Sequence, residues 1–347
     1  MVKKKEEFDY SAEIKKLKAG GPGRLYLLYG EEDYLRDRYL ETLKSLCIPE
    51  GESGFNFKRI DGPGLDVSEV EKAIDQMPFL SDRTFLELRN VDINKLADAD
   101  RHIAVLSSVP DYCTVCFVQD ASYETDGRLK FVKFLKDKGV ALQFVSQGQS
   151  KLISWIKRRF EAAGKEIDNA TAQRLVFISG DLMNSLIPEI EKIAAYAKGE
   201  KVTVADVNAV ANRIPESDIF DLTNAIADRR FQSASGILAD LLGQRNVSVP
   251  AILSLLSNQF RRILIASEAK DTAAVMELCN LKSDYPARLL RNSARGFEKA
   301  QLQQAITLCA QADYRLKSES VDEKQLLKET VMRIALSCGE TRPENLR

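Results

Sequence analysis

The chain has 347 residues, of which 44% are hydrophobic and 29% are charged, a composition typical of a soluble globular protein with two or three domains. The formal net charge of -1 excludes a global basic field for nucleic acids or membranes, so any DNA contact has to come from a local patch. No apolar run approaches the roughly 18 residues of a membrane span, and the start MVKKKEEFDY lacks a signal-peptide core, so we expect a cytoplasmic protein without a membrane partner.

The first part of the chain alternates between strand and helix patterns. After a short helix over 11–18, strands are predicted at 24–30, 55–60, 84–88, 113–118 and 140–145, and helices at 35–46, 67–77, 96–106 and 129–135. A strand–helix unit repeated about five times predicts a parallel sheet with helices on its faces. We assign this α/β domain to residues 1–147.

The strand patterns stop near residue 147. Helices are predicted at 152–160, 170–179, 183–194 and 203–211, which make a small helical domain over 148–213. Residues 214–217 are interpreted as a linker, and helical patterns continue from there, so a third, all-helical domain is predicted over 214–347. The predicted fold is therefore an α/β domain followed by two all-α domains.

A phosphate-binding loop would belong directly after the first strand. The segment there contains one glycine, Gly30, followed by three carboxylates at Glu31, Glu32 and Asp33, and it has no Lys-Ser/Thr pair. A P-loop needs several glycines and a lysine to hold the phosphates, and carboxylates repel them. The architecture therefore predicts a nucleotide-binding type of domain whose phosphate site does not work.

Other candidate chemistry is weak. Cys113 and Cys116 form a Cys-x-x-Cys, but the pair lies inside an apolar strand and the chain has a single histidine, His102, so we predict core cysteines and no metal site. That single histidine also disfavours a Ser/His/Asp arrangement. Lys157, Arg158 and Arg159 are candidates for DNA phosphate contacts, although such clusters are more often simply exposed helix faces.

Residues 76–80 are a candidate interaction site. The predicted helix over 67–77 runs into Pro78, and two large apolar residues follow, Phe79 and Leu80. Proline cannot continue a helix and restrains the residue before it, so both apolar residues are predicted to lie at a turn. Such a pair either folds back onto the core or protrudes toward the pocket of another protein. The residues alone leave both readings open.

Several stretches together resemble the delta subunits of the bacterial DNA polymerase III clamp loader. They occur in family order and cover nearly the whole chain: LYLLYGEEDYL, QMPFLSDRTFLEL, CTVCFVQD, LISWIKRRFEAAGKEID, GDLMNSLIPEIEKIAAYA, VTVADV, IFDLTNAIADR and ILSLLSNQFRRIL. Each stretch is mostly a hydrophobic pattern, and their order and spacing make the resemblance specific. It implies an AAA+-like first domain without a working ATP site, a lid-like second domain and a collar domain for oligomerisation.

The resemblance also implies a function. Delta subunits open the sliding clamp without hydrolysing ATP, so we expect this chain to have no catalytic activity of its own and no cofactor. It would be a subunit of a holoenzyme that is a nucleotidyltransferase. The implied partners are the beta clamp, the tau/gamma motor subunits, delta-prime, and primed DNA reached through the assembled loader. The clamp-binding element of the family falls on Gln76, Met77, Pro78, Phe79 and Leu80. Here the apolar pair has the order Phe-Leu, whereas Leu-Phe is frequent in the family, which leaves the subpocket of each side chain open.

On this reading, Phe79 and Leu80 are predicted to be solvent-accessible in the free chain. Three alternatives stay open. A delta-prime or motor subunit of the same loader would carry a P-loop or a Ser-Arg-Cys triplet, and neither is found. A nucleotide-dependent enzyme with a degenerate α/β domain would bind nucleotide. A helical scaffold unrelated to replication would not co-purify with clamp or loader subunits.

Overall fold

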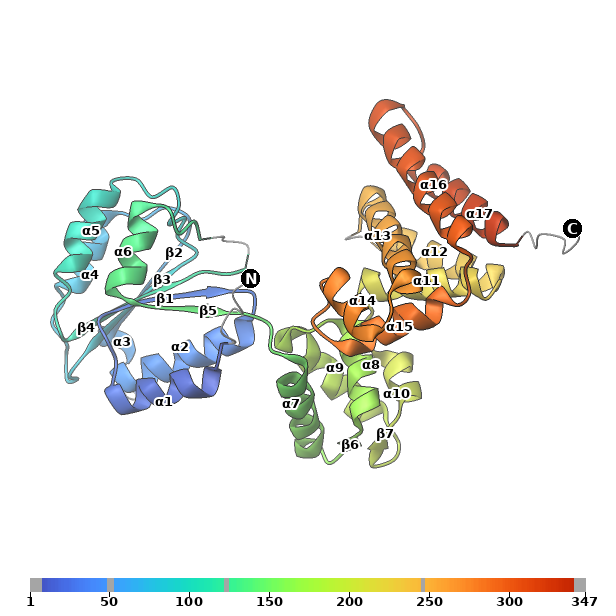
Figure 1. Ribbon diagram of the computed structural model, residues 1–347. Helices are drawn as coiled ribbons and strands as arrows, with labels where there is room; N and C mark the ends of the chain where they lie inside the picture. The colour runs from blue at the N-terminus through green and yellow to red at the C-terminus, as the bar shows by residue number, and fades with distance from the viewer. Residues whose placement is uncertain (1–7, 49–52, 122–124, 245–246, 340–347) are drawn as a thin grey trace, which may run out of the picture. The chain divides into compact units, whose positions relative to one another are not determined.

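The structure is a computed structural model that describes residues 8–48, 53–121, 125–244 and 247–339 (Figure 1). The chain divides into two compact units. The first comprises residues 1–148 and 182–184, and the second comprises residues 149–181 and 185–347. The boundary near residue 148 falls where the strand patterns stop in the sequence.

The first unit is built on a five-stranded parallel sheet with the strand order β2-β3-β4-β1-β5. Every predicted strand is present, with the bounds β1 Leu25–Gly30, β2 Phe57–Asp61, β3 Thr84–Arg89, β4 Cys113–Val118 and β5 Val140–Phe144. The helices of this unit are α1 Tyr10–Gly20, α2 Asp33–Cys47, α3 Ser53–Asn56, α4 Val67–Ile74, α5 Ala99–Ser107 and α6 Lys130–Lys138. The predicted α/β class of this part is confirmed.

Helices cover both faces of the sheet (Figure 1). Helices α4, α5 and α6 lie on one face, where Leu27, Val115 and Phe117 form an apolar cluster with Val70 and Leu135. Helices α1 and α2 lie on the other face. Because side chains alternate along a strand, successive apolar residues of β1 supply both layers of the core. The near-continuous apolar strands of the sequence are thereby explained.

Two of the predicted boundaries that were wrong lie beside the turn at residues 76–80. The strand predicted from residue 55 begins at Phe57, and Phe55 and Asn56 belong instead to the short helix α3. The helix predicted to reach Met77 ends at Ile74. Continuing that helix would bring the Pro78 ring against the carbonyl of Ile74, four residues earlier, so it stops before the proline.

The second unit begins with four helices, α7 Gln149–Ala162, α8 Asn169–Ser179, α9 Met183–Tyr196 and α10 Val204–Val210. A short parallel ribbon of β6 Glu166–Ile167 and β7 Lys201–Val202 joins them. The prediction that strands end near residue 147 was wrong for this ribbon. Two-residue strands contain too few positions to produce an alternating pattern, so the sequence carries no period from which to predict them.

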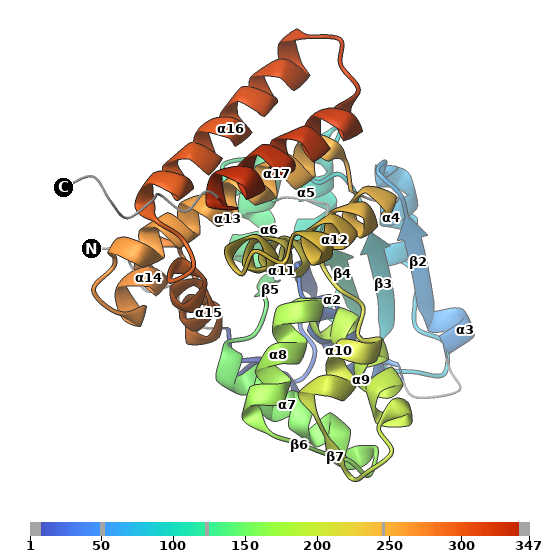
Figure 2. The same cartoon turned by 90° about the vertical axis from the view of Figure 1, so that its right-hand side faces the viewer.

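The rest of the second unit is helical, as predicted (Figure 2). The interpretation of residues 214–217 as a linker was wrong, because α11 begins at Pro215, and proline suits the first position of a helix. Its helices are α11 Pro215–Ala227, α12 Phe231–Gly243, α13 Val249–Glu268, α14 Thr272–Leu278, α15 Asp284–Ala294, α16 Lys299–Ser318 and α17 Glu323–Gly339. They share one apolar core that extends from Ile219 to Cys338 and includes Leu256, Phe260 and Leu308. Helices α16 and α17 lie side by side in both views.

The cysteines support the fold rather than forming a reactive site. Cys113 and Cys116 are fully buried in β4, which confirms their prediction as core residues. Burial raises the pKa of both thiols above the ordinary value, so the reactive thiolate is disfavoured. Over the ranges that the structure describes, no three His, Cys, Asp or Glu side chains gather into a metal-binding group. No described helix combines the length and the apolar character that crossing a bilayer requires.

Candidate protein-interaction site

Four large apolar side chains are exposed together beside the turn that follows α4. Phe79 is 56% exposed and Leu80 is 80% exposed, so the prediction that both are solvent-accessible is confirmed. Met77 and Phe55 are 71% and 70% exposed, and the Phe55 and Phe79 rings lie 5.3 Å apart. We call Phe55, Met77, Phe79 and Leu80 the turn patch. Its apolar side chains are available to another molecule without any unfolding.

The backbone of the turn is held by a buried amide side chain that the sequence reading missed. Asn56 accepts a hydrogen bond from the Phe79 amide nitrogen through Oδ1, and it donates one to the Phe79 carbonyl through Nδ2, both at 2.7 Å. Gln76 adds a third link, because its Nε2 donates to the Phe55 carbonyl at 2.9 Å. Pro78 is half-buried between these contacts. The turn is thus fixed by polar contacts while its apolar side chains stay outside.

Leu80 has a left-handed backbone conformation, with φ of 52°. This region is uncommon for a residue with a large side chain and costs roughly 1–2 kcal/mol. Such conformations persist where neighbouring contacts hold them, and they cluster at binding sites and other functional positions. The strained backbone of Leu80 therefore agrees with an interaction role for the turn.

The turn patch lies at the end of the sheet where the strands begin. Phe55 and Asn56 immediately precede β2, and the turn at 76–83 immediately precedes β3, which pairs with β2 in parallel register. The phosphate-loop position follows β1 and therefore lies at the opposite end of the same sheet. Parallel α/β sheets bind nucleotides at the carboxyl ends of their strands, so the patch is separate from that position.

At the phosphate-loop position, the backbone packs against β5 and makes hydrogen bonds within the chain. Gly30 has φ of 126°, and a Cβ there would lie 2.1 Å from the Phe144 carbonyl oxygen, so glycine is required by the close approach of β5. The amide of Glu32 donates to the same carbonyl oxygen at 3.1 Å, and the Ser146 amide donates to the Glu31 carboxylate at 3.1 Å. The single glycine is explained by packing and not by phosphate binding.

An arginine stands at the spacing of the P-loop lysine, six residues after Gly30. Arg36 is buried, and its guanidinium contacts the carboxylates of Asp33 at 2.5 Å, Asp37 at 3.0 Å and Asp120 at 3.1 Å. It also donates to the Gln119 carbonyl at 3.1 Å. The sequence reading missed this group, although the spacing from Gly30 was available. The charge of Arg36 is therefore already neutralised by the protein's own carboxylates.

Removing Arg36 is expected to destabilise the first unit. The Arg36→Ala variant removes a buried guanidinium from three carboxylates that are each 38–43% exposed, so the cost, discounted for solvent, is expected to be about 1.5–3 kcal/mol. Urea unfolding followed by circular dichroism measures the change. Arg38→Ala is the matched control, because Arg38 is exposed on the same helix and loses an exposed hydrogen bond to the Tyr34 hydroxyl at 2.8 Å, which should cost less than about 1 kcal/mol. Equal stability of the two variants would contradict the structural role of Arg36.

The predicted basic cluster lies on α7. Arg158 is exposed, whereas Lys157 and Arg159 are half-buried, and the Arg159 guanidinium lies 5.2 Å from the centre of the Trp155 ring. A cation over an aromatic face is a stabilising contact that needs no ligand. Only part of the cluster therefore presents its charge outward.

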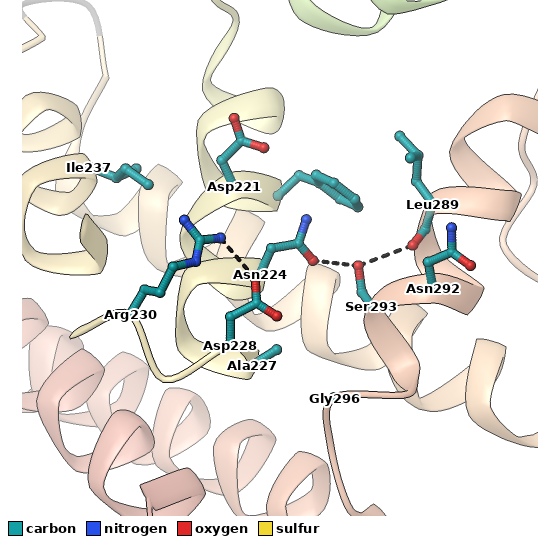
Figure 3. Close-up of a pocket in the computed structure, with 11 residues that line it drawn as sticks. Asp221, Asn224, Ala227, Asp228, Arg230, Ile237, Leu289, Asn292, Ser293 and Gly296 are labelled. Carbon is teal, nitrogen blue, oxygen red and sulfur yellow. Dashed lines mark hydrogen bonds and ion pairs between the residues drawn. The ribbon is translucent and has the colours of Figure 1, made fainter. Parts of the chain in front are cut away.

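A pocket of about 490 Å³ with a mixed polar and apolar lining lies between α11, α12 and α15 (Figure 3). Its charges are paired internally, since Arg230 bonds to Asp228 at 2.8 Å. The hydroxyl of Ser293 lies 2.5 Å from Asn224 Oδ1 and 3.1 Å from the Leu289 carbonyl oxygen. Among the described residues that line the pocket, none is a histidine or a lysine that could activate this serine. The geometry does not support nucleophilic catalysis here.

A second apolar surface lies on the helical unit. Phe231 of α12 is 42% exposed, and Met332 and Leu336 of α17 are 60% and 62% exposed. These side chains line a groove of about 550 Å³ together with Ala234, Ser235, Leu238, Ala239, Lys328, Val331 and Ala335. We call it the α12–α17 groove. Met332 and Leu336 are four residues apart and therefore share one face of α17.

Two family models match the chain. The model described as DNA polymerase III, delta subunit matches residues 26–145, and the model described as DNA polymerase III delta subunit, C-terminal domain matches residues 216–334. The first match contains Phe55, Asn56 and the turn at 76–80. The second contains Phe231 and Met332 of the α12–α17 groove.

Curated relatives match nearly the full length. The chain is 27% identical over 331 residues to DNA polymerase III subunit delta of Bacillus subtilis, covering 90% of this chain and 93% of that protein. It is 22% identical over 323 residues to the probable DNA polymerase III subunit delta of Aquifex aeolicus, covering 88% and 89%. The solved structure of the Bacillus subtilis DNA clamp loader delta protein matches this fold with a TM-score of 0.51 and 23% identity, covering 94% of this chain and 100% of that one.

Proposed function

Because the chain belongs to the family of DNA polymerase III delta subunits, we propose that it binds the beta sliding clamp and opens its ring for loading onto primed DNA. The clamp-binding element of this proposal is Gln76, Met77, Pro78, Phe79 and Leu80. The alternative of a delta-prime or motor subunit loses support, because both matching family models carry the delta description.

The exposure of Phe79 and Leu80 is the observation that carries the proposal. Isolated exposed apolar residues are ordinary, but a group of exposed apolar residues on one hydrogen-bonded turn is typical of a protein-binding site. Burying each side chain in a clamp pocket contributes roughly 1.5–3 kcal/mol. The two residues together are therefore sufficient to act as the hot spot of such an interface.

Ring opening requires more than binding. A ligand shifts a conformational equilibrium only by its differential affinity for the two states, so the chain has to bind the open clamp more tightly than the closed one. The turn patch supplies anchoring, and the neighbouring helix α4 would press near the clamp's subunit interface. In the assembled loader, the ATP state of the motor subunits would control access to the patch.

The experiment that tests the proposal is a binding measurement between the purified chain and purified beta clamp. Surface plasmon resonance with immobilised clamp should show saturable binding that free chain in solution competes away. A clamp with its apolar pocket blocked by a clamp-binding peptide serves as the control. Absence of saturable binding, or equal binding to the blocked clamp, contradicts the proposed function.

No nucleotide hydrolysis is expected of the isolated chain. Arg36 already contacts three carboxylates at the position where a P-loop lysine would hold phosphates, and the Glu32 amide is bonded to Phe144. Phosphate release from ATP, measured with and without primed DNA and clamp, should equal the background of buffer. Turnover that follows the protein concentration and co-elutes with the chain would favour a nucleotide-dependent enzyme instead.

The helical unit is proposed to join the other loader subunits. We divide it into a lid-like domain at 148–213 and a collar at 214–347, and the α12–α17 groove is the collar surface that would receive a helix of a tau/gamma or delta-prime neighbour. Its volume and its apolar lining match the groove type of helix recognition. The chain would act there as a non-catalytic subunit of the polymerase III holoenzyme.

DNA contact is proposed to be secondary and local. The net charge of -1 provides no general attraction for the phosphate backbone, so Lys157, Arg158 and Arg159 are proposed to touch primed DNA only within the assembled loader. Arg158 is the member of this cluster whose exposure suits that role best.

A further inference from the structure

We propose that the clamp-binding surface has two segments, and that Phe55 and Asn56 belong to it together with the turn at 76–80. Phe55 would contact the clamp directly as a third aromatic or aliphatic anchor. Asn56 would act as a positioning residue that holds the Phe79 backbone in its binding conformation. This inference rests on the proposed function, since the partner is the same sliding clamp.

The contacts of Asn56 support the positioning role. Its side chain is 2% exposed, and both of its polar groups are used on one residue, the amide and the carbonyl of Phe79. These two backbone groups belong to no helix or strand, so a side chain has to satisfy them where water does not. A turn that only closed α4 would bury its apolar side chains. Here the buried amide fixes the backbone, and Phe79 and Leu80 stay exposed.

Leu80 provides an independent observation. Its φ of 52° places its side chain outward at a conformational cost, and the residue before it is the one that Asn56 holds on both sides. Without the two hydrogen bonds from Asn56, the turn would relax to several conformations. Binding would then select the competent one and lose affinity in proportion to its population.

The position of Phe55 supports direct contact. Its ring lies 5.3 Å from the Phe79 ring, and its carbonyl receives the Gln76 hydrogen bond, so it moves with the turn. At 70% exposure it makes little contribution to the core of the free chain. It extends the exposed apolar surface of Phe79. A clamp pocket that takes Phe79 therefore meets Phe55 at its rim.

The test measures clamp affinity by surface plasmon resonance for Phe55→Ala, Phe55→Leu and Asn56→Ala. Phe55→Ala and Asn56→Ala should each weaken binding about tenfold, whereas Phe55→Leu, which keeps an apolar side chain, should stay within about threefold. Val140→Ala is the control, because Val140 is an exposed apolar residue of β5, at the sheet edge opposite β2. It should bind like the unmodified chain.

A double-mutant cycle separates positioning from general stability. If Asn56 acts by holding the turn, Asn56→Ala should have little further effect on clamp binding in a background in which both Phe79 and Leu80 are replaced by alanine, because the turn then presents no anchor side chain. Chymotrypsin should also cleave after Phe79 or Leu80 faster in Asn56→Ala, with the thermal unfolding of the remaining fold as reference. Should Asn56→Ala fail to fold, Phe55→Ala still tests the surface, because Phe55 is exposed.

The outcomes distinguish the two levels of the proposal. If Phe55→Ala and Asn56→Ala bind like the unmodified chain while the Phe79→Ala and Leu80→Ala double variant loses binding, the two-segment surface is wrong and the clamp-binding turn stands. If the unmodified chain does not bind the clamp, or the double variant binds normally, the proposed function itself fails. Additive effects of Asn56→Ala and the Phe79→Ala and Leu80→Ala double variant would overturn the positioning role.

Discussion

Replacing Phe79 and Leu80 together with alanine is expected to weaken clamp binding by at least about 100-fold, because two hot-spot side chains would each lose about 2 kcal/mol or more. Both residues are more than half exposed in the free chain, so their truncation removes little core packing. Clamp affinity is measured by surface plasmon resonance, and assembly with tau/gamma and delta-prime is measured by gel filtration. Clamp binding should be lost while assembly is retained.

The matched control for this variant keeps the turn and removes a comparable exposed side chain elsewhere in the first unit. Val140→Ala serves this purpose, since Val140 is 40% exposed on β5. Circular dichroism and thermal unfolding should be the same for all three proteins. Unchanged clamp affinity of the double variant would contradict the assignment of residues 76–80 as the clamp-binding element.

Introducing charge into the α12–α17 groove is expected to abolish loader assembly and to leave clamp binding intact. The variant Met332→Asp with Leu336→Asp places two carboxylates on a face that is proposed to be buried against a neighbouring subunit, where an unpaired charge costs several kcal/mol. That cost corresponds to a loss of assembly affinity of about 100-fold or more. Both side chains are about 60% exposed in the free chain, so monomer stability should change little.

Leu278→Asp is the control for the groove, because Leu278 is 65% exposed on α14 and does not line it. Gel filtration of the chain with tau/gamma and delta-prime should show normal assembly for this control and separate peaks for the groove variant. Normal assembly of the groove variant would move the collar interface to another surface. The groove variant and the Phe79→Ala and Leu80→Ala variant together test whether clamp binding and loader assembly reside on separate units of the chain.

The sequence was sufficient for the elements whose patterns repeat. The apolar strands of the first unit and the amphipathic helices of both units were predictable because burial imposes a period on each of them. The two-residue strands β6 and β7 were not predictable, because no period exists over two residues. Residues 55–56 were misassigned to β2 because Phe55 and Phe57 alternate with polar residues as a strand would.

For the candidate site, too, some features were predictable from the sequence and others were not. Pro78 and the two large apolar residues after it predicted a turn from local chemistry alone, and the resemblance to delta subunits favoured its exposure. Whether Phe79 and Leu80 point inward or outward depends on contacts with residues more than twenty positions earlier, chiefly the buried amide of Asn56. Arg36 is a mixed case, because Asp33 and Asp37 are its neighbours in sequence, whereas Asp120, two residues after β4, reaches it only through folding. Local sequence specifies where the chain turns, whereas partners distant in sequence decide which side chains are left for another protein, because only folding brings those partners within hydrogen-bonding distance.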